Sequence, residues 1–171
     1  MNIFLKSIIY LVLFSFLHFI YDLTNLDFLK PISGINESVY QHLKMAFFAY
    51  FFVSIIEYLI IKKKIAKRDS FWYSRLLSTN IIPWLTFSVW YLVPATIGKL
   101  KSATIEIIWA ILATYISGLF TILIERDTEN LTFSIRFKII ILILFFVSLF
   151  LFVKFTYSLP WIDLFVNPET L

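Results

Sequence analysis

The chain has 171 residues, of which 60% are hydrophobic and 20% aromatic, and its formal net charge is +4. Soluble domains contain roughly 45–50% apolar residues, so a soluble fold of this length could not bury the excess. Cysteine is absent, which excludes disulfides, thiolate metal sites and cysteine nucleophiles. The basic residues lie in short clusters between apolar runs, a pattern typical of membrane orientation, so we expect no nucleic-acid partner.

Apolar runs of membrane-spanning length follow one another along the chain. A spanning helix needs about 20 mostly apolar residues, and its backbone polar groups must be satisfied within the segment because hydrocarbon offers no partners. The sequence contains five such runs: Ile3–Leu23, His42–Ile61, Leu76–Ala95, Ala103–Ile124 and Ile135–Tyr157. We therefore predict an all-α fold, a bundle of five transmembrane helices that forms a single transmembrane domain over residues 1–171 and has the lipid bilayer as its surroundings.

Proline and glycine mark the interruptions of this pattern. Pro31 and Gly34 break the connection between the first two runs, and we expect a helix to restart near Asn36. Pro83 and Pro94 fall in the third run, where proline removes a backbone hydrogen bond and predicts a kink.

Small residues recur at helical spacing in the fourth run. Ala110, Thr114 and Gly118 are four residues apart, and such a stripe lets a second helix approach closely. We interpret the stripe as internal packing rather than as a dimerisation surface.

Positive charges are distributed unequally between the two ends of the predicted helices. One end has Lys6, Lys62, Lys63, Lys64, Lys67, Arg68, Arg75, Arg126, Arg136 and Lys138. The other end has Lys30, Lys44, Lys99, Lys101 and Lys154. The positive-inside rule then predicts a multi-pass protein of the cell membrane with a cytoplasmic N-terminus and an outer C-terminus.

Polar residues at membrane depth gather toward the outer end. Each ionisable group there costs on the order of 2.5–3.5 kcal/mol, so each calls for a reason. The residues in question are His18, Asp22, Glu37, His42, Glu106, Trp161 and Asp163.

His18 and Asp22 close the first run. Their four-residue spacing places them about 40° apart on one helix face. This arrangement suits a histidine oriented by a carboxylate, or two ligands of one metal. The alternative is a partly solvated pair at the membrane interface.

The segment that opens the second helix is amphipathic. A helical projection groups Glu37, Ser38, Gln41 and His42 along one stripe, which we expect to face the bundle interior. The alternative is simple capping, in which Asn36 is the N-cap and Glu37 compensates the positive end of the helix dipole. Capping alone leaves Gln41 and His42 without a role.

Two further glutamates lie inside the predicted spans. Glu106 is about a turn below the outer end of the fourth run, where it would either pair with Lys99 or Lys101 or join the outer cluster. Glu57 lies near the cytoplasmic end of the second run, and we expect an ion pair with the lysines at 62–64. Apart from Glu57, we expect no matching polar residues in the cytoplasmic half.

Two sequence segments carry a family resemblance. His18-Phe19-Ile20-Tyr21-Asp22 and Asn36-Glu37-Ser38-Val39-Tyr40-Gln41-His42-Leu43-Lys44 resemble a family of small uncharacterised prokaryotic membrane proteins whose hallmark reads Asn-Glu-Ser-Val-aromatic-Glu-His-Leu-Lys. Gln41 stands where that hallmark has glutamate. The tail from Phe155 to Pro168 also resembles the closing segment of the family. The resemblance implies a shared site but no particular reaction.

Two classes of function fit these residues. Two imidazoles with carboxylates form a ligand set that a divalent metal such as Zn²⁺ accepts. The first hypothesis is a membrane-embedded metal-dependent hydrolase of a lipid-like substrate, with His18, Glu37, His42 and Glu106 as metal ligands and with catalytic residues His18, Asp22, Glu37 and His42. The second is a non-enzymatic ion or small-ligand binding or transport protein, or a membrane-complex subunit. The sequence contains no HExxH, GxSxG or P-loop motif to decide between them.

Overall fold

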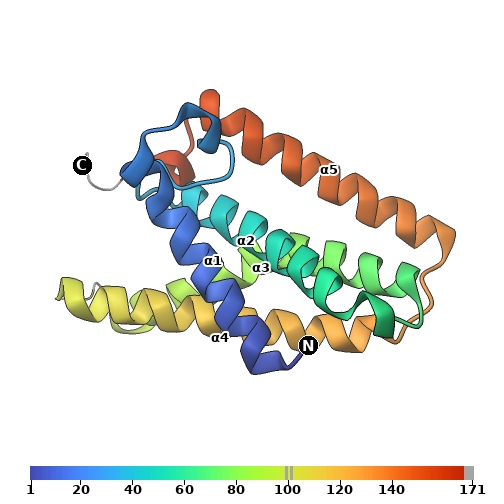
Figure 1. Cartoon of the computed structure of the whole chain (residues 1–171). Coiled ribbons are helices and arrows are strands. Elements are labelled where there is room, and N and C mark those ends of the chain that lie inside the picture. The colour runs from blue at the N-terminus through green and yellow to red at the C-terminus, as the bar shows by residue number, and fades with distance from the viewer. Residues whose placement is uncertain (99, 101, 168–171) are drawn as a thin grey trace.

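Five long helices make up most of the chain (Figure 1). The structure, a computed structural model, describes residues 1–98, 100 and 102–167. The helices are α1 (Ile3–Thr24), α2 (Val39–Ile61), α3 (Arg68–Ile97), α4 (Ala103–Glu129) and α5 (Ile135–Tyr157). Short 3₁₀ segments, η1 (Asp27–Leu29), η2 (Lys62–Lys64) and η3 (Asp163–Phe165), lie between or after them, and the described residues contain no strand. The predicted all-α fold is confirmed.

The surface of the bundle is apolar along its length. All five helices are long and apolar enough to cross a membrane. Leu92, Ile135 and Phe150 are 60%, 71% and 61% exposed, which suits contact with hydrocarbon better than contact with water. These helices indicate a multi-pass membrane protein.

The start of α2 differs from the prediction. Ser38 is extended and stands at the N-cap, so the helix begins at Val39 rather than near Asn36 or at His42. The side chain of Asn36 does not cap the helix; its Oδ1 accepts a hydrogen bond from the Ser38 N–H at 3.0 Å. This local turn competes with helix formation, as is typical of asparagine.

The third helix is longer than its apolar run. It begins at Arg68, eight residues before the predicted start at Leu76, and continues through both Pro83 and Pro94. Ser74 and Arg75 in its early turns are buried. Average hydropathy underestimates the length of a helix whose polar side chains point into the bundle.

Helix α2 forms the centre of the bundle. Met45, Ala46, Phe47, Ala49 and Tyr50 are completely buried. α1 and α3 pack on α2, and α4 packs on α1 and α3. α5 packs on α3 and, through aromatic side chains, on α2, and it lies along the upper edge of the molecule in Figure 1.

Gly118 of α4 is packed against α1, as its small-residue stripe predicts. A Cβ at this position would lie 2.8 Å from Tyr10 Cδ1 and 3.8 Å from Ser7 Oγ. We expect Gly118→Leu to lower the free energy of unfolding in detergent by about 1–3 kcal/mol, the usual cost of overpacking. Phe120→Leu changes a half-exposed side chain of the same helix and is the control. An unchanged melting temperature for Gly118→Leu would contradict this packing.

Candidate functional site

The connection between α1 and α2 folds back over the ends of both helices. Its Gly34 N–H donates a hydrogen bond to the Leu17 carbonyl at 3.0 Å. A Cβ on Gly34 would lie 2.9 Å from Met45 Sδ and 3.5 Å from the His18 carbonyl oxygen, so a side chain here would require the Met45 side chain to move. The hydrogen bond from Gly34 to Leu17 holds the connection close to α1, and Glu37 follows three residues later.

Glu37 lies between the two histidines. Its Oε1 is 3.5 Å from His18 Nε2, and its Oε2 is 3.5 Å from His42 Nε2. The two imidazole rings are 5.4 Å apart between centroids. One donor atom from each of the three residues lies within 4.8 Å of the others. We call His18, Glu37 and His42 the outer site.

These distances resemble those between ligands of one small cation. Two ligands at roughly 2.0–2.1 Å from a tetrahedral ion are about 3.3–3.4 Å apart, close to the observed nitrogen–oxygen spacing of 3.5 Å. A direct N–H···O hydrogen bond is usually shorter, about 2.7–3.2 Å. The three side chains are 23%, 40% and 33% exposed, so the outer site is accessible from one side.

His42 is oriented by its own helix. Its Nδ1–H donates a hydrogen bond to the Ser38 carbonyl at 3.0 Å, one turn earlier on α2. This bond leaves a lone pair on Nε2, the nitrogen that faces Glu37. A backbone carbonyl that holds the distal ring nitrogen is the usual arrangement for a metal-binding histidine.

The surroundings of the outer site are mixed in polarity. The His18 imidazole, whose Nε2 faces the carboxylate at 3.5 Å, lowers the pKa of the Glu37 carboxyl below its ordinary value, so this group is ionised at neutral pH. On the inner side, Phe14 lies 6.4 Å from His42 between ring centroids. The buried rings and aliphatic side chains of α1 and α2 continue inward from there.

Other predicted members of the cluster lie outside this group. Asp22 is exposed, one turn beyond His18 on α1. Glu106 is exposed on α4 and is not among the residues whose donor atoms converge. Its predicted partners Lys99 and Lys101 lie outside the described residues, as does the end of the tail at Pro168.

Two polar side chains next to the outer site are completely enclosed. Ser38 is 1% exposed and Gln41 is 0% exposed. The Ser38 hydroxyl and both amide atoms of Gln41 have no hydrogen-bond partner within the described part of the chain. Ser38 and Gln41 of the predicted polar stripe therefore face the interior, whereas Glu37 and His42 of the same stripe are partly exposed.

A second polar cluster, which the sequence analysis missed, lies at the other end of the bundle. Lys6 Nζ is 2.5 Å from both Glu57 Oε2 and Glu125 Oε1. Arg75 Nη2 is 3.1 Å from Glu57 and 3.3 Å from Glu125, and Arg75 Nη1 pairs with Glu129. We call these five residues the inner cluster.

The inner cluster overturns two expectations. Glu57 pairs with Lys6 and Arg75 inside the bundle rather than with the lysines at 62–64, and it is 3% exposed. The cytoplasmic half is therefore not poor in polar residues. One signal was present in the sequence: Thr121 and Glu125 follow the small-residue stripe of α4 along the same buried face.

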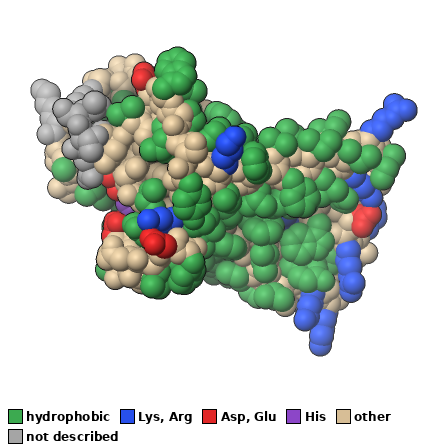
Figure 2. Space-filling view, turned by 90° about the horizontal axis from the view of Figure 1, so that it is seen from above, with side chains coloured by type: hydrophobic (Ala, Val, Ile, Leu, Met, Phe, Trp, Pro, Cys, Tyr) green, Lys and Arg blue, Asp and Glu red, His purple; other side chains and the backbone are tan. Residues whose placement is uncertain are grey.

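The two ends of the molecule differ in charge. In Figure 2 most lysine and arginine side chains gather at one end, whereas histidine and carboxylate side chains appear in a recess at the opposite end. This separation agrees with the unequal distribution of charges read from the sequence.

Comparison with known proteins identifies a family but no characterised relative. No curated protein and no solved structure matches the chain. The assignment of the segment Asn36–Lys44 to the hallmark of a prokaryotic membrane-protein family stays a prediction. A family of unknown function, DUF6512, matches residues 2–170, and the chain belongs to this family.

Proposed function

We propose that the outer site binds one divalent cation such as Zn²⁺ and that the protein is a metal-dependent hydrolase of a lipid-like substrate at the outer membrane boundary. The observation that carries this proposal is the convergence of His18, Glu37 and His42 donor atoms within 4.8 Å of one another. Two imidazoles and one carboxylate are the ligands of many catalytic zinc sites, which keep a fourth position open.

The residues of the chain have separable roles in this proposal. His18, Glu37 and His42 hold the cation, and the Ser38 carbonyl fixes the ring of His42. The bound cation would supply Lewis acidity and lower the pKa of a water molecule. Asp22, exposed one turn from His18, is the proposed general base, and the apolar surface of the surrounding helices would hold the acyl chains of the substrate.

Lipid hydrolysis tests the proposal directly. The purified protein, loaded with zinc and reconstituted in liposomes of mixed phospholipids, should release products that mass spectrometry detects and that a chelator abolishes. Asp22→Asn should lower kcat by roughly 10²-fold or more, as expected for loss of a general base, while the zinc content stays unchanged. No zinc-dependent product from any lipid class would contradict the hydrolase.

A second candidate, cation binding or transport, is favoured by the inner cluster. Intramembrane charged groups often mark ion pathways, and Lys6, Glu57 and Arg75 provide such groups away from the outer site. However, Phe14 and Ala46 lie between the two polar regions along α1 and α2, and both are buried. These two apolar side chains favour a site open to one side. Zinc uptake into proteoliposomes without any lipid product would support the second candidate instead.

The proposed orientation places the outer site outside the cell and the lysine-rich end in the cytoplasm. Because the chain has no cysteine, single cysteines report the two sides without background. An impermeant thiol reagent added to intact cells should label Leu26→Cys in the first connection and spare Lys63→Cys in η2. The opposite labelling pattern would reverse the orientation.

A further inference from the structure

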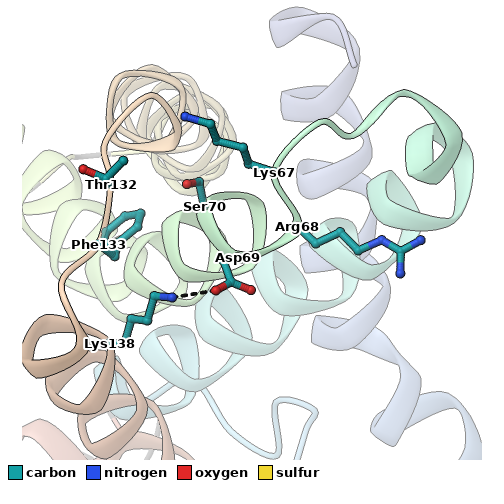
Figure 3. Close-up of a pocket in the computed structure, with 7 residues that line it drawn as sticks. All are labelled: Lys67, Arg68, Asp69, Ser70, Thr132, Phe133 and Lys138. Atoms are coloured by element: carbon teal, nitrogen blue, oxygen red, sulfur yellow. Dashed lines mark hydrogen bonds and ion pairs between the residues drawn. The ribbon is translucent and has the colours of Figure 1, made fainter.

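A pocket at the lysine-rich end lies between the starts of α3 and α5 (Figure 3). It has a volume of about 310 Å³ and is lined by Lys67, Arg68, Asp69, Ser70, Thr132, Phe133 and Lys138. Since these residues flank the ends of spanning helices, the pocket lies at the level where a membrane meets water.

Positive charge dominates this pocket. Lys138 Nζ pairs with Asp69 Oδ2 at 2.5 Å, but no carboxylate of the described residues pairs with Lys67 or Arg68. In Figure 3 the Lys67 side chain extends past Ser70 toward Thr132, whereas Arg68 points to the other side. Lys67 therefore offers an unpaired ammonium beside two hydroxyl-bearing side chains.

The other wall of the pocket is aromatic. Phe133 packs against Tyr73, with ring centroids 6.0 Å apart, and stacks on Phe137 at 5.7 Å. Lys138 Nζ lies 5.2 Å from the centre of the Tyr73 ring. Aromatic side chains are favoured at the headgroup level of membranes, where one part of the surroundings is apolar and the other is wet.

We infer that this pocket binds the phosphodiester headgroup of an anionic phospholipid. The phosphate would accept hydrogen bonds from Lys67, and the glycerol and upper acyl chains would lie against Phe133. Basic pockets between transmembrane helices recognise such headgroups. This inference is independent of the outer site, because it concerns the opposite end of the bundle and predicts a bound lipid rather than a substrate.

Binding of short-chain phosphatidylglycerol, compared with phosphatidylcholine of the same chain length, tests the inference. The full-length protein in neutral detergent micelles at 0.15 M salt, where long-range attraction is largely screened, should prefer phosphatidylglycerol in a tryptophan-fluorescence titration. Lys67→Gln should weaken its binding by roughly fivefold. Lys63→Gln removes the same charge from the preceding turn, outside the pocket lining, and should change the affinity less than about twofold. Equal losses in the two variants would show diffuse attraction and overturn the inference.

Two further variants separate the pocket from a general loss of folding. Asp69→Asn frees Lys138 and should strengthen binding, a direction that misfolding does not produce. Thr132→Trp fills the pocket without removing charge and should abolish the preference for phosphatidylglycerol. Inorganic phosphate at millimolar concentration should not compete with the lipid; if it displaces the lipid fully, the site recognises a free anion and the inference fails.

Discussion

Replacing Lys6 by methionine is expected to lower the free energy of unfolding by about 3–5 kcal/mol, the cost of removing one partner of a buried ion pair. The Lys6 ammonium contacts two carboxylates, of Glu57 and Glu125, and all three side chains are 3% exposed or less. Methionine fills similar space but leaves the negative charges of both carboxylates only partly compensated by Arg75. Equilibrium unfolding in mixed detergent micelles, followed by circular dichroism, measures the change.

Two variants show whether this loss comes from the buried charges. Lys62→Met removes an exposed lysine of the same end and should change stability by no more than about 0.5 kcal/mol. The double variant Lys6→Met with Glu125→Gln should recover part of the loss, because it removes opposite charges together. A double variant whose loss equals the sum of the two single losses would contradict direct coupling across the inner cluster.

Replacing His42 by alanine is expected to weaken zinc binding by more than about 100-fold. Even residues that only orient a metal ligand contribute roughly 10–100-fold to affinity, and the proposal makes His42 a ligand itself. The side chain is partly exposed, so the substitution should leave the bundle folded. Competition with a chromophoric chelator gives the dissociation constant.

Glu106→Gln is the matched control for this prediction. Glu106 was predicted from sequence as a further ligand, but it is exposed on α4 and outside the outer site. Its replacement should change zinc affinity by less than about twofold. A loss with Glu106→Gln as large as that with His42→Ala would place the cation elsewhere.

The fold could be predicted largely from hydropathy, because each spanning helix must form its backbone hydrogen bonds within its own apolar segment. The errors occur where polar residues lie inside the bundle. α3 begins at Arg68, and its early turns contain Ser74 and Arg75, which are buried. A hydropathy average cannot separate such buried polar residues from solvated ones. At α2, the side chain of Asn36 forms a local turn instead of a cap, a choice that depends on the folded connection.

The outer site was predictable in part for an energetic reason. Histidines and a carboxylate near the ends of apolar runs are costly unless they meet, and the structure brings His18, Glu37 and His42 together. The inner cluster was missed because Lys6 and Glu57 lie near helix ends, where charges are usually solvated. The ion pairs of the inner cluster join residues of four helices. No single stretch of sequence contains that information.

X-ray absorption at the zinc K edge, on protein carrying one equivalent of zinc, tests the central claim most directly. The outer site predicts two imidazole nitrogens and one carboxylate oxygen at roughly 2.0–2.1 Å from the ion. The imidazole signal should disappear in the variant His18→Ala with His42→Ala. A spectrum of hydrated zinc in the unmodified protein, or an imidazole signal that survives both substitutions, would contradict a cation site formed by His18, Glu37 and His42.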